Sequence, residues 1–166
     1  MRRKRIKIPG ATYDCEGTVN RFLDELEQSE VKKLMLKTIK EAKMLYHFLL
    51  LNFVVLNNNV RLIVSPLENE DLSEIMKWLF GTFAKRWNDM HHIRGHFFYD
   101  RFKSFIIYCK NDFLKSLKDF LKNIKALKLS KVAVKYEYSG FASIKEKDFS
   151  LVDPFPDDYE FVGLEV

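Results

Sequence analysis

FVVLNNNVRLIV, residues 53–64, is the most informative segment of this 166-residue sequence. It lies within two apolar runs, 48–56 and 60–64, and the three asparagines at 57–59 separate them. Short apolar runs bounded by turn residues are typical of buried strands, and asparagine tolerates the left-handed backbone conformations of tight turns. The segment therefore predicts a β-hairpin. Ser65-Pro66 is expected to end its second strand.

Amphipathic helices are predicted on both sides of this hairpin. Residues 30–45 and 72–87 place apolar side chains at helical spacing, and residues 113–127 add an apolar stripe opposite a ridge of lysines. Residues 11–18 carry a weaker strand signal, and the β-branched and aromatic run at 102–109 is a further candidate strand. This order of elements predicts an α+β protein, an antiparallel sheet covered by helices, related to ferredoxin-like and RNA-recognition folds.

Length and composition indicate one globular domain. The chain is 47% apolar and 31% charged, and it is long enough to bury a core. No apolar run approaches the roughly 20 residues of a membrane span, and the start MRRKRIKIPG lacks the apolar segment of a secretory signal. We therefore expect no membrane association and a cytoplasmic location. Cys15 and Cys109 lack CxxC spacing, so we expect both to be buried and without a disulfide.

Charge is distributed unevenly along the chain. A net charge of +5 and an isoelectric point near 9.1 favour an anionic partner. Basic residues crowd the first eight positions, whereas residues 153–166 carry only acids. We expect a domain at 1–145 with a basic arm at 1–8, followed by an acidic C-terminal tail at 146–166. The tail is either a solvated extension or a cover for the basic face, and the sequence leaves both open.

Several local sequences, taken in order, resemble the HUH-type single-tyrosine transposases, especially their REP-associated branch. The resemblance covers roughly residues 2–143, and RFKS at 101–104 is its most specific piece. The hairpin at 53–64 is similar to a family hairpin that reads like YVLMPNHVHLLI. GHFFYDRFKS at 95–104 is similar to the family's GHLWQGRFKS. The other matching segments are PGATY at 9–13, TVNR at 18–21 and the helix start at 72–78.

The resemblance implies a transposase fold and a known chemistry. Members of the family cut single-stranded DNA, typically beside a hairpin, when a tyrosine oxygen attacks the scissile phosphate. Mg²⁺ or Mn²⁺ polarises that phosphate, held by a His-hydrophobic-His motif and by a third polar ligand one turn after the tyrosine. The resemblance places Asn59 and Arg61 at the two histidines, Phe120 at the tyrosine and Ile124 at the third ligand.

These four substitutions remove the groups that the family's reaction needs. An arginine cannot ligate a divalent cation, and its charge opposes one. Phenylalanine has no oxygen that could attack phosphorus. We therefore expect no catalytic residue, no metal site and no cofactor at Asn59, Arg61, Phe120 and Ile124. The resemblance then implies a protein that binds single-stranded or hairpin DNA without cutting it, and that forms a homodimer as family members do.

Basic side chains supply the expected nucleic-acid interface. Arg61 could clasp a phosphate through a bidentate guanidinium pair, or it could pair with a nearby carboxylate. Arg101 and Lys103 on the strand at 102–109, together with the lysine ridge of the last helix, could follow a DNA backbone. That ridge consists of Lys115, Lys118 and Lys122, with Lys125 after them. The aromatic residues Trp78, Trp87, Phe97 and Phe98 could stack on bases or belong to the core.

Two other functions remain open. His91, His92 and His96, with Tyr99 and Asp100 nearby, could form a replacement metal and nucleophile site in an active transposase or nickase. Adjacent histidines point in different directions in any regular element, which weighs against such a site. The protein could also be a non-catalytic RNA-binding or protein-binding module on the same kind of sheet.

Overall fold

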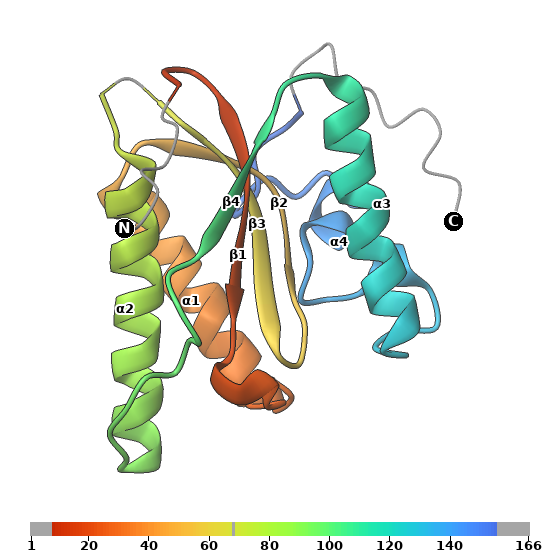
Figure 1. Ribbon diagram of the computed structural model, residues 1–166. Helices are drawn as coiled ribbons and strands as arrows, with labels where there is room; N and C mark the ends of the chain where they lie inside the picture. The colour runs from red at the N-terminus through yellow and green to blue at the C-terminus, as the bar shows by residue number, and fades with distance from the viewer. Residues whose placement is uncertain (1–7, 68, 156–166) are drawn as a thin grey trace.

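The computed structural model describes residues 8–67 and 69–155 (Figure 1). Most of the basic arm expected at 1–8, and the part of the acidic tail at 156–166, lie outside the described residues. Among the described residues, one antiparallel sheet has the strand order β2-β3-β1-β4. Its strands are β1 (Thr12–Thr18), β2 (Phe48–Val55), β3 (Asn59–Pro66) and β4 (Lys103–Ile107). The helices are α1 (Ser29–Leu45), α2 (Leu72–His91), α3 (Lys110–Ala126) and α4 (Gly140–Lys145), with short 3-10 turns η1 (Asn20–Phe22) and η2 (Ala133–Lys135).

The predicted order of strands and helices is confirmed as far as α3, with differences at the helix ends, whereas α4 was not predicted. The side chain of Asp71 accepts a hydrogen bond from the backbone N–H of Ser73 and so caps the start of α2. This helix continues beyond its expected end at Trp87 to His91. It ends where His92 adopts the left-handed conformation, with a φ of 54°.

The sheet lies between two helical layers, as Figure 1 shows, with α1 and α2 on one face and α3 and α4 on the other. Successive residues along a strand point to opposite faces of the sheet. Gly17 faces α2, and a Cβ atom at this position would lie 2.8 Å from Cε1 of Phe80. A glycine here therefore lets α2 approach β1 closely. The other face of β1 and β3 carries the polar residues described below.

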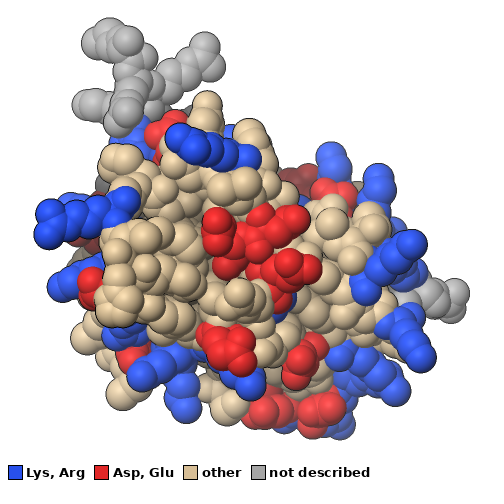
Figure 2. Space-filling view, turned by 90° about the horizontal axis from the view of Figure 1, so that it is seen from below, with Lys and Arg blue, Asp and Glu red and all other residues tan. Residues whose placement is uncertain are grey.

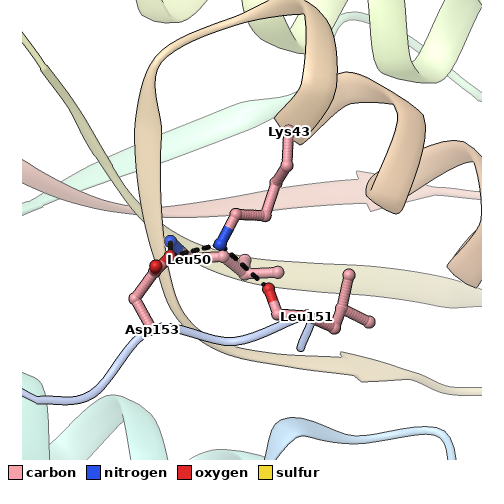
Figure 3. A network of polar contacts seen from close by, with 4 residues as sticks. All are labelled: Lys43, Leu50, Leu151 and Asp153. Atoms are coloured by element: carbon pink, nitrogen blue, oxygen red, sulfur yellow. Dashed lines mark hydrogen bonds and ion pairs between the residues drawn. The ribbon is translucent and has the colours of Figure 1, made fainter. Parts of the chain in front are cut away.

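The free edge of β2 is covered by two later segments of the chain. Ser139 forms an isolated bridge with Val54. Further on, the backbone N–H of Asp153 donates to the carbonyl of Leu50 at 2.8 Å. The Asp153 carboxylate accepts from the Leu50 N–H at 2.8 Å and pairs with the ammonium of Lys43 on α1 (Figure 3). The tail boundary expected at 145 coincides with the end of α4, yet the chain continues to pack on the domain as far as these contacts.

Replacing Asp153 with alanine is expected to lower the free energy of unfolding by about 1–3 kcal/mol. The substitution leaves the Leu50 N–H and the Lys43 ammonium without their shared acceptor. Urea unfolding would measure the loss. Asp148→Ala is the control, because Asp148 is exposed and accepts a hydrogen bond from Ser150 only two residues away. Equal effects of the two substitutions would contradict a role for Asp153 in holding this segment to β2.

Lys32 is a buried cation between α1 and the hairpin turn. Its ammonium donates to the carbonyl of Leu26, to the carbonyl of Leu56 at 3.4 Å and to Oδ1 of Asn57 at 2.9 Å. Burial lowers the pKa of Lys32 to about 8, although the nearby charge of Glu27 opposes the shift. Lys32 therefore links the segment before α1 to the β2–β3 turn.

Two further expectations concern the cysteines and the membrane. Cys15 is buried and Cys109 is exposed, and no disulfide joins them. The expectation of two buried cysteines is therefore wrong for Cys109, which lies just before α3 at a solvent-exposed corner. Within residues 8–67 and 69–155, no helix is both long enough and apolar enough to cross a membrane.

Candidate nucleic-acid interface

The face of the sheet that carries Arg61 also carries a set of charged side chains on β1. Glu16 pairs with Arg61 across the β1–β3 ladder, and Thr18 pairs with Asn59. Because residues two apart on a strand share a face, Asp14 lies on the same side of β1 as Glu16. Two carboxylates, an amide and a guanidinium are therefore gathered on one face.

Arg61 is engaged by Asp14. Its Nε donates to Oδ1 of Asp14 at 3.3 Å, and its Nη2 forms an ion pair with Oδ2. The Asp14 side chain is only 4% exposed and that of Arg61 15% exposed. The Cζ atom of Arg61 also lies 4.7 Å from the ring centroid of Phe120, within the range of a cation–π contact. A phosphate would have to compete with Asp14 for this guanidinium.

Asn59, Phe120 and Ile124 are the other positions that the sequence resemblance places at a metal ligand or at the nucleophile. Nδ2 of Asn59 donates to Oε1 of Glu16 at 3.3 Å, whereas its buried Oδ1 has no hydrogen-bond partner among the described residues. Phe120 and Ile124 are fully buried on the inner side of α3. One amide oxygen, a permanent cation and two hydrocarbon side chains do not fit a divalent cation, which prefers several oxygen ligands or imidazole and thiolate. The neighbouring carboxylates of Asp14 and Glu16 are engaged by Arg61 and by Asn59, respectively.

The structure thus brings some of the sequence-predicted positions together. Arg61 and Phe120 are in contact, and Asn59 lies on the same strand face. The sequence interpretation missed Asp14 and Glu16. Their alternation with buried Tyr13 and Cys15 in β1 is a signal that could have placed both carboxylates on the face of Arg61.

The other predicted basic residues are exposed. Lys103 opposes Glu16 in the β1–β4 ladder and so lies on the face of Arg61. Arg101 precedes it, and both side chains are exposed. α3 starts soon after β4 ends, so its outward lysines follow directly in the chain. Among the described residues, none of these basic side chains forms an ion pair; the α3 lysines predicted for the interface are Lys115, Lys118 and Lys122.

The predicted base-stacking residues are mostly core. Trp87 and Phe97 are buried, with their ring centroids 4.7 Å apart. Trp78 packs edge-on against Tyr46. Several exposed aromatic side chains were not among those predicted: Phe22 and Tyr99 stack on each other at 5.8 Å and are each 64% exposed, and Phe105 on β4 is 60% exposed.

The histidines do not gather into a metal site. His91 places Nδ1 2.8 Å from the Trp87 carbonyl, whereas His92 caps α2. His91, His92 and His96 are all exposed. Within the ranges 8–67 and 69–155, no group of three or more His, Cys, Asp or Glu side chains is arranged to hold a metal ion.

Charge differs between the sides of the molecule. Four acids, Asp24, Glu25, Glu27 and Glu30, lie in and just before the start of α1. Figure 2, seen from the lower end of Figure 1, shows acidic side chains gathered in the middle of this face and Lys and Arg side chains along its flanks, including the flank of α3. This end of the molecule therefore presents negative charge in its middle and positive charge along its flanks.

Comparisons with known proteins find a likeness in structure. Neither protein-family models nor the sequences of well-characterised proteins match this chain. The structure of a REP-associated tyrosine transposase bound to a REP hairpin matches with a TM-score of 0.72 at 18% sequence identity, over 96% of this chain and 91% of that chain. A protein from Deinococcus radiodurans R1, provisionally assigned as a transposase, matches with a TM-score of 0.53 at 14% identity, over 74% of this chain and 97% of its own.

The match to the hairpin-bound transposase covers 96% of this chain. It confirms the α+β architecture expected from the sequence. This chain therefore has the fold of the REP-associated tyrosine transposases.

Proposed function

We propose that this protein binds single-stranded or hairpin DNA and does not cut it. The DNA part of the proposal is supported by the fold, which a hairpin-bound transposase shares, and by the exposed basic side chains of β4 and α3. The interface comprises Arg101 and Lys103, followed by Lys115, Lys118 and Lys122. Arg61 joins it only when Asp14 releases its guanidinium.

The observation that carries the non-catalytic part is the Arg61–Asp14 pair on the Phe120 ring. Phosphoryl transfer by a tyrosine enzyme needs a nucleophilic oxygen and a positive charge that stabilises the transition state at the phosphate. The sequence resemblance puts Phe120, a hydrocarbon ring, at the nucleophile's position. The guanidinium of Arg61 is already paired with the carboxylate of Asp14, so Arg61 and Phe120 meet neither requirement.

Replacing Lys115, Lys118 and Lys122 with glutamine is expected to lower affinity for a DNA hairpin by on the order of tenfold at moderate salt. Each lost phosphate contact also reduces the slope of log affinity against log salt by about 1. Fluorescence anisotropy over a salt series would measure both quantities.

The matched control replaces three exposed lysines of α1, on the opposite helical layer, with glutamine: Lys33, Lys37 and Lys40. This variant has the same net charge as the first. Equal losses of affinity in the two variants would contradict a specific interface on α3 and would indicate attraction by net charge alone.

A labelled hairpin oligonucleotide incubated with Mg²⁺ or Mn²⁺ tests the absence of cutting. We expect no cleaved strand and no tyrosine-linked product. A covalent product would establish an active transposase or nickase with a rebuilt site. Tighter binding of an RNA hairpin than of the matching DNA hairpin, at equal salt, would favour an RNA-binding module instead.

The proposal also includes a homodimer in the cytoplasm. Light scattering after size-exclusion chromatography, with and without the hairpin, would measure the mass. A monomer in both conditions would remove the dimer from the proposal without affecting DNA binding.

A further inference from the structure

The lysine ridge of α3 has no ion-pair partner among the described residues. Lys115, Lys118 and Lys122 are all exposed, and none of them pairs with a described carboxylate. Residues three and four positions apart lie on one side of a helix, so the three ammonium groups are neighbours. Like charges at this spacing repel one another. An acidic segment that reaches the ridge therefore stabilises it.

The last described residues bring the chain to this helix. Asp153 is fixed to the edge of β2 by its contacts with Leu50 and Lys43 (Figure 3). Two residues later, the ring of Phe155 packs edge-on against that of Phe113, near the start of α3, with ring centroids 4.9 Å apart. The chain has thus crossed from β2 to α3 by residue 155, and whatever follows begins beside the helix that carries the ridge.

The segment that follows has the charge that the ridge lacks. Residues 156–166, PDDYEFVGLEV, lie outside the described residues and contain no lysine or arginine. Their acids are Asp157, Asp158, Glu160 and Glu165. Three of these four come within five residues of Phe155, so the acidic part of the segment is tethered close to α3.

The spacing of these acids suits the spacing of the lysines. An extended chain rises about 3.3 Å per residue, so residues 157–160 can span roughly 10 Å. A helix rises about 1.5 Å per residue, which separates Lys115 from Lys122 by roughly the same length along the axis. Lys115 lies two positions after Phe113, and Asp157 lies two positions after Phe155. A segment that continues from the Phe155–Phe113 contact along α3 therefore brings its first acids to the first ridge lysines.

The tether also makes weak contacts sufficient. A single exposed ion pair contributes little to stability. A short covalent link, however, holds the two partners at an effective concentration of millimolar order, so a few such pairs occupy the ridge for much of the time. The ridge therefore has an acidic occupant within its own chain.

We propose that the segment 156–166 lies on the lysine ridge of α3 in the free protein, and that DNA has to displace it. The inference rests on the proposed DNA binding and adds a competitor for the same lysines. Of the two roles that the sequence leaves open for the acidic tail, it selects the cover. A covered ridge lowers the affinity for every polyanion and favours those that make further contacts, at Arg101 and Lys103 for example.

Carbodiimide cross-linking of the full-length protein tests the contact without DNA. The reagent joins a carboxylate to an amine that touches it, forming an amide while the carbodiimide takes up the water as a urea. We expect mass spectrometry to find amides between the acids at 157–160 and the ridge lysines, and to lose them when hairpin DNA is added. The reference lysines are the exposed residues of α1, Lys33, Lys37 and Lys40, which should form none. A mixture of ¹⁵N-labelled and unlabelled protein separates links within a chain from links between chains.

Neutralising the acids tests the competition. The full-length variant with Asp157→Asn, Asp158→Asn and Glu160→Gln loses three negative charges without shortening the chain. We expect it to bind the DNA hairpin more tightly than the wild type by on the order of tenfold at moderate salt. The gain should shrink as salt is raised, because salt screens the exposed pairs in the wild type.

A matched control removes three negative charges elsewhere. Asp24→Asn, Glu30→Gln and Asp89→Asn change exposed positions in α2 and in or just before α1. This variant has the same net charge as the tail variant. Its gain in affinity should be about twofold or less, since it leaves the segment 156–166 on the ridge. Thermal unfolding of both variants checks that they are folded.

The outcomes separate this inference from the proposed function. Equal gains in the two variants, or no gain in either, overturn the competition, as do ridge lysines that cross-link no more than those of α1. Links found only between labelled and unlabelled chains place the segment on a second copy and overturn a contact within the chain. A wild type and a tail variant that both fail to bind the hairpin, although the links form, remove the proposed DNA binding and leave the contact standing.

Discussion

Replacing Arg61 with methionine is expected to lower the free energy of unfolding by about 3–5 kcal/mol. The Asp14 carboxylate is almost fully buried and depends on this guanidinium for its compensating charge. Methionine keeps much of the volume and the contact with Phe120 but leaves Asp14 as an unpaired charge in the interior. Urea unfolding at neutral pH would measure the loss.

A double-mutant cycle identifies the source of this loss. Asp14→Asn combined with Arg61→Met removes both charges, so the double variant should be more stable than Arg61→Met alone. If the two substitutions are simply additive, the ion pair does not account for the effect. DNA affinity of the folded single variant gives a second result. If Arg61→Met weakens DNA binding by less than about 1 kcal/mol, Arg61 stays paired with Asp14 in the complex. A larger loss of binding free energy identifies Arg61 as a phosphate ligand.

The free energy of unfolding is expected to rise between pH 8 and pH 10.5 because of Lys32. Its pKa is lowered by burial to about 8, against 10.5 for an ordinary lysine. Below pH 8 the ammonium is charged in both states, and the folded state bears the cost of burying it. Above pH 8 the folded state loses that proton first, so the cost disappears as the pH approaches 10.5. The full gain is on the order of 3 kcal/mol.

The difference in the free energy of unfolding between wild type and Lys32→Met, measured by urea unfolding from pH 8 to pH 10.5, isolates the contribution of Lys32. Lys33→Met, at the exposed neighbouring position, is the control and should follow the wild type. Burial raises the pKa of Tyr136 and Tyr138, and such tyrosines lower stability above pH 10, so the range from 8 to 9.5 is the most informative. An unchanged pH profile in Lys32→Met would contradict the assignment.

The elements that local pattern determines were predicted, and those that depend on distant partners were not. The asparagine triplet and the two apolar runs were enough for the hairpin, because turn chemistry and strand periodicity are local. The Arg61–Asp14 pair joins residues 47 positions apart, and only the register of β1 against β3 brings them together. The sequence could name Arg61 as a candidate but could not choose between a carboxylate and a phosphate as its partner.

Local sequence was also insufficient to predict which aromatic side chains are exposed. Trp87 and Phe97 were candidates for base stacking, yet both are buried, whereas Phe22 and Tyr99 stack at the surface. Periodicity along α2 places Trp87 on the core side, but nothing local marks which rings of the 95–102 segment face outward. Their direction depends on how that segment crosses the end of β1, where Tyr99 donates its N–H to the carbonyl of Thr18.

Residues 139 and 151–153 lie along the outer edge of β2, and they therefore limit how this sheet can pair with a strand of another chain. An uncovered strand edge is a template for a further strand, which is the usual origin of intermolecular sheets and of aggregation. With that side of the sheet sealed, β4 is the remaining edge among the described residues. It is only five residues long and begins with a lysine, two features that discourage indiscriminate strand addition. A continuous sheet built from two copies through this edge would join at β4, beside the Lys103 of the proposed DNA interface, so joining strands and the proposed DNA binding would compete for one narrow edge.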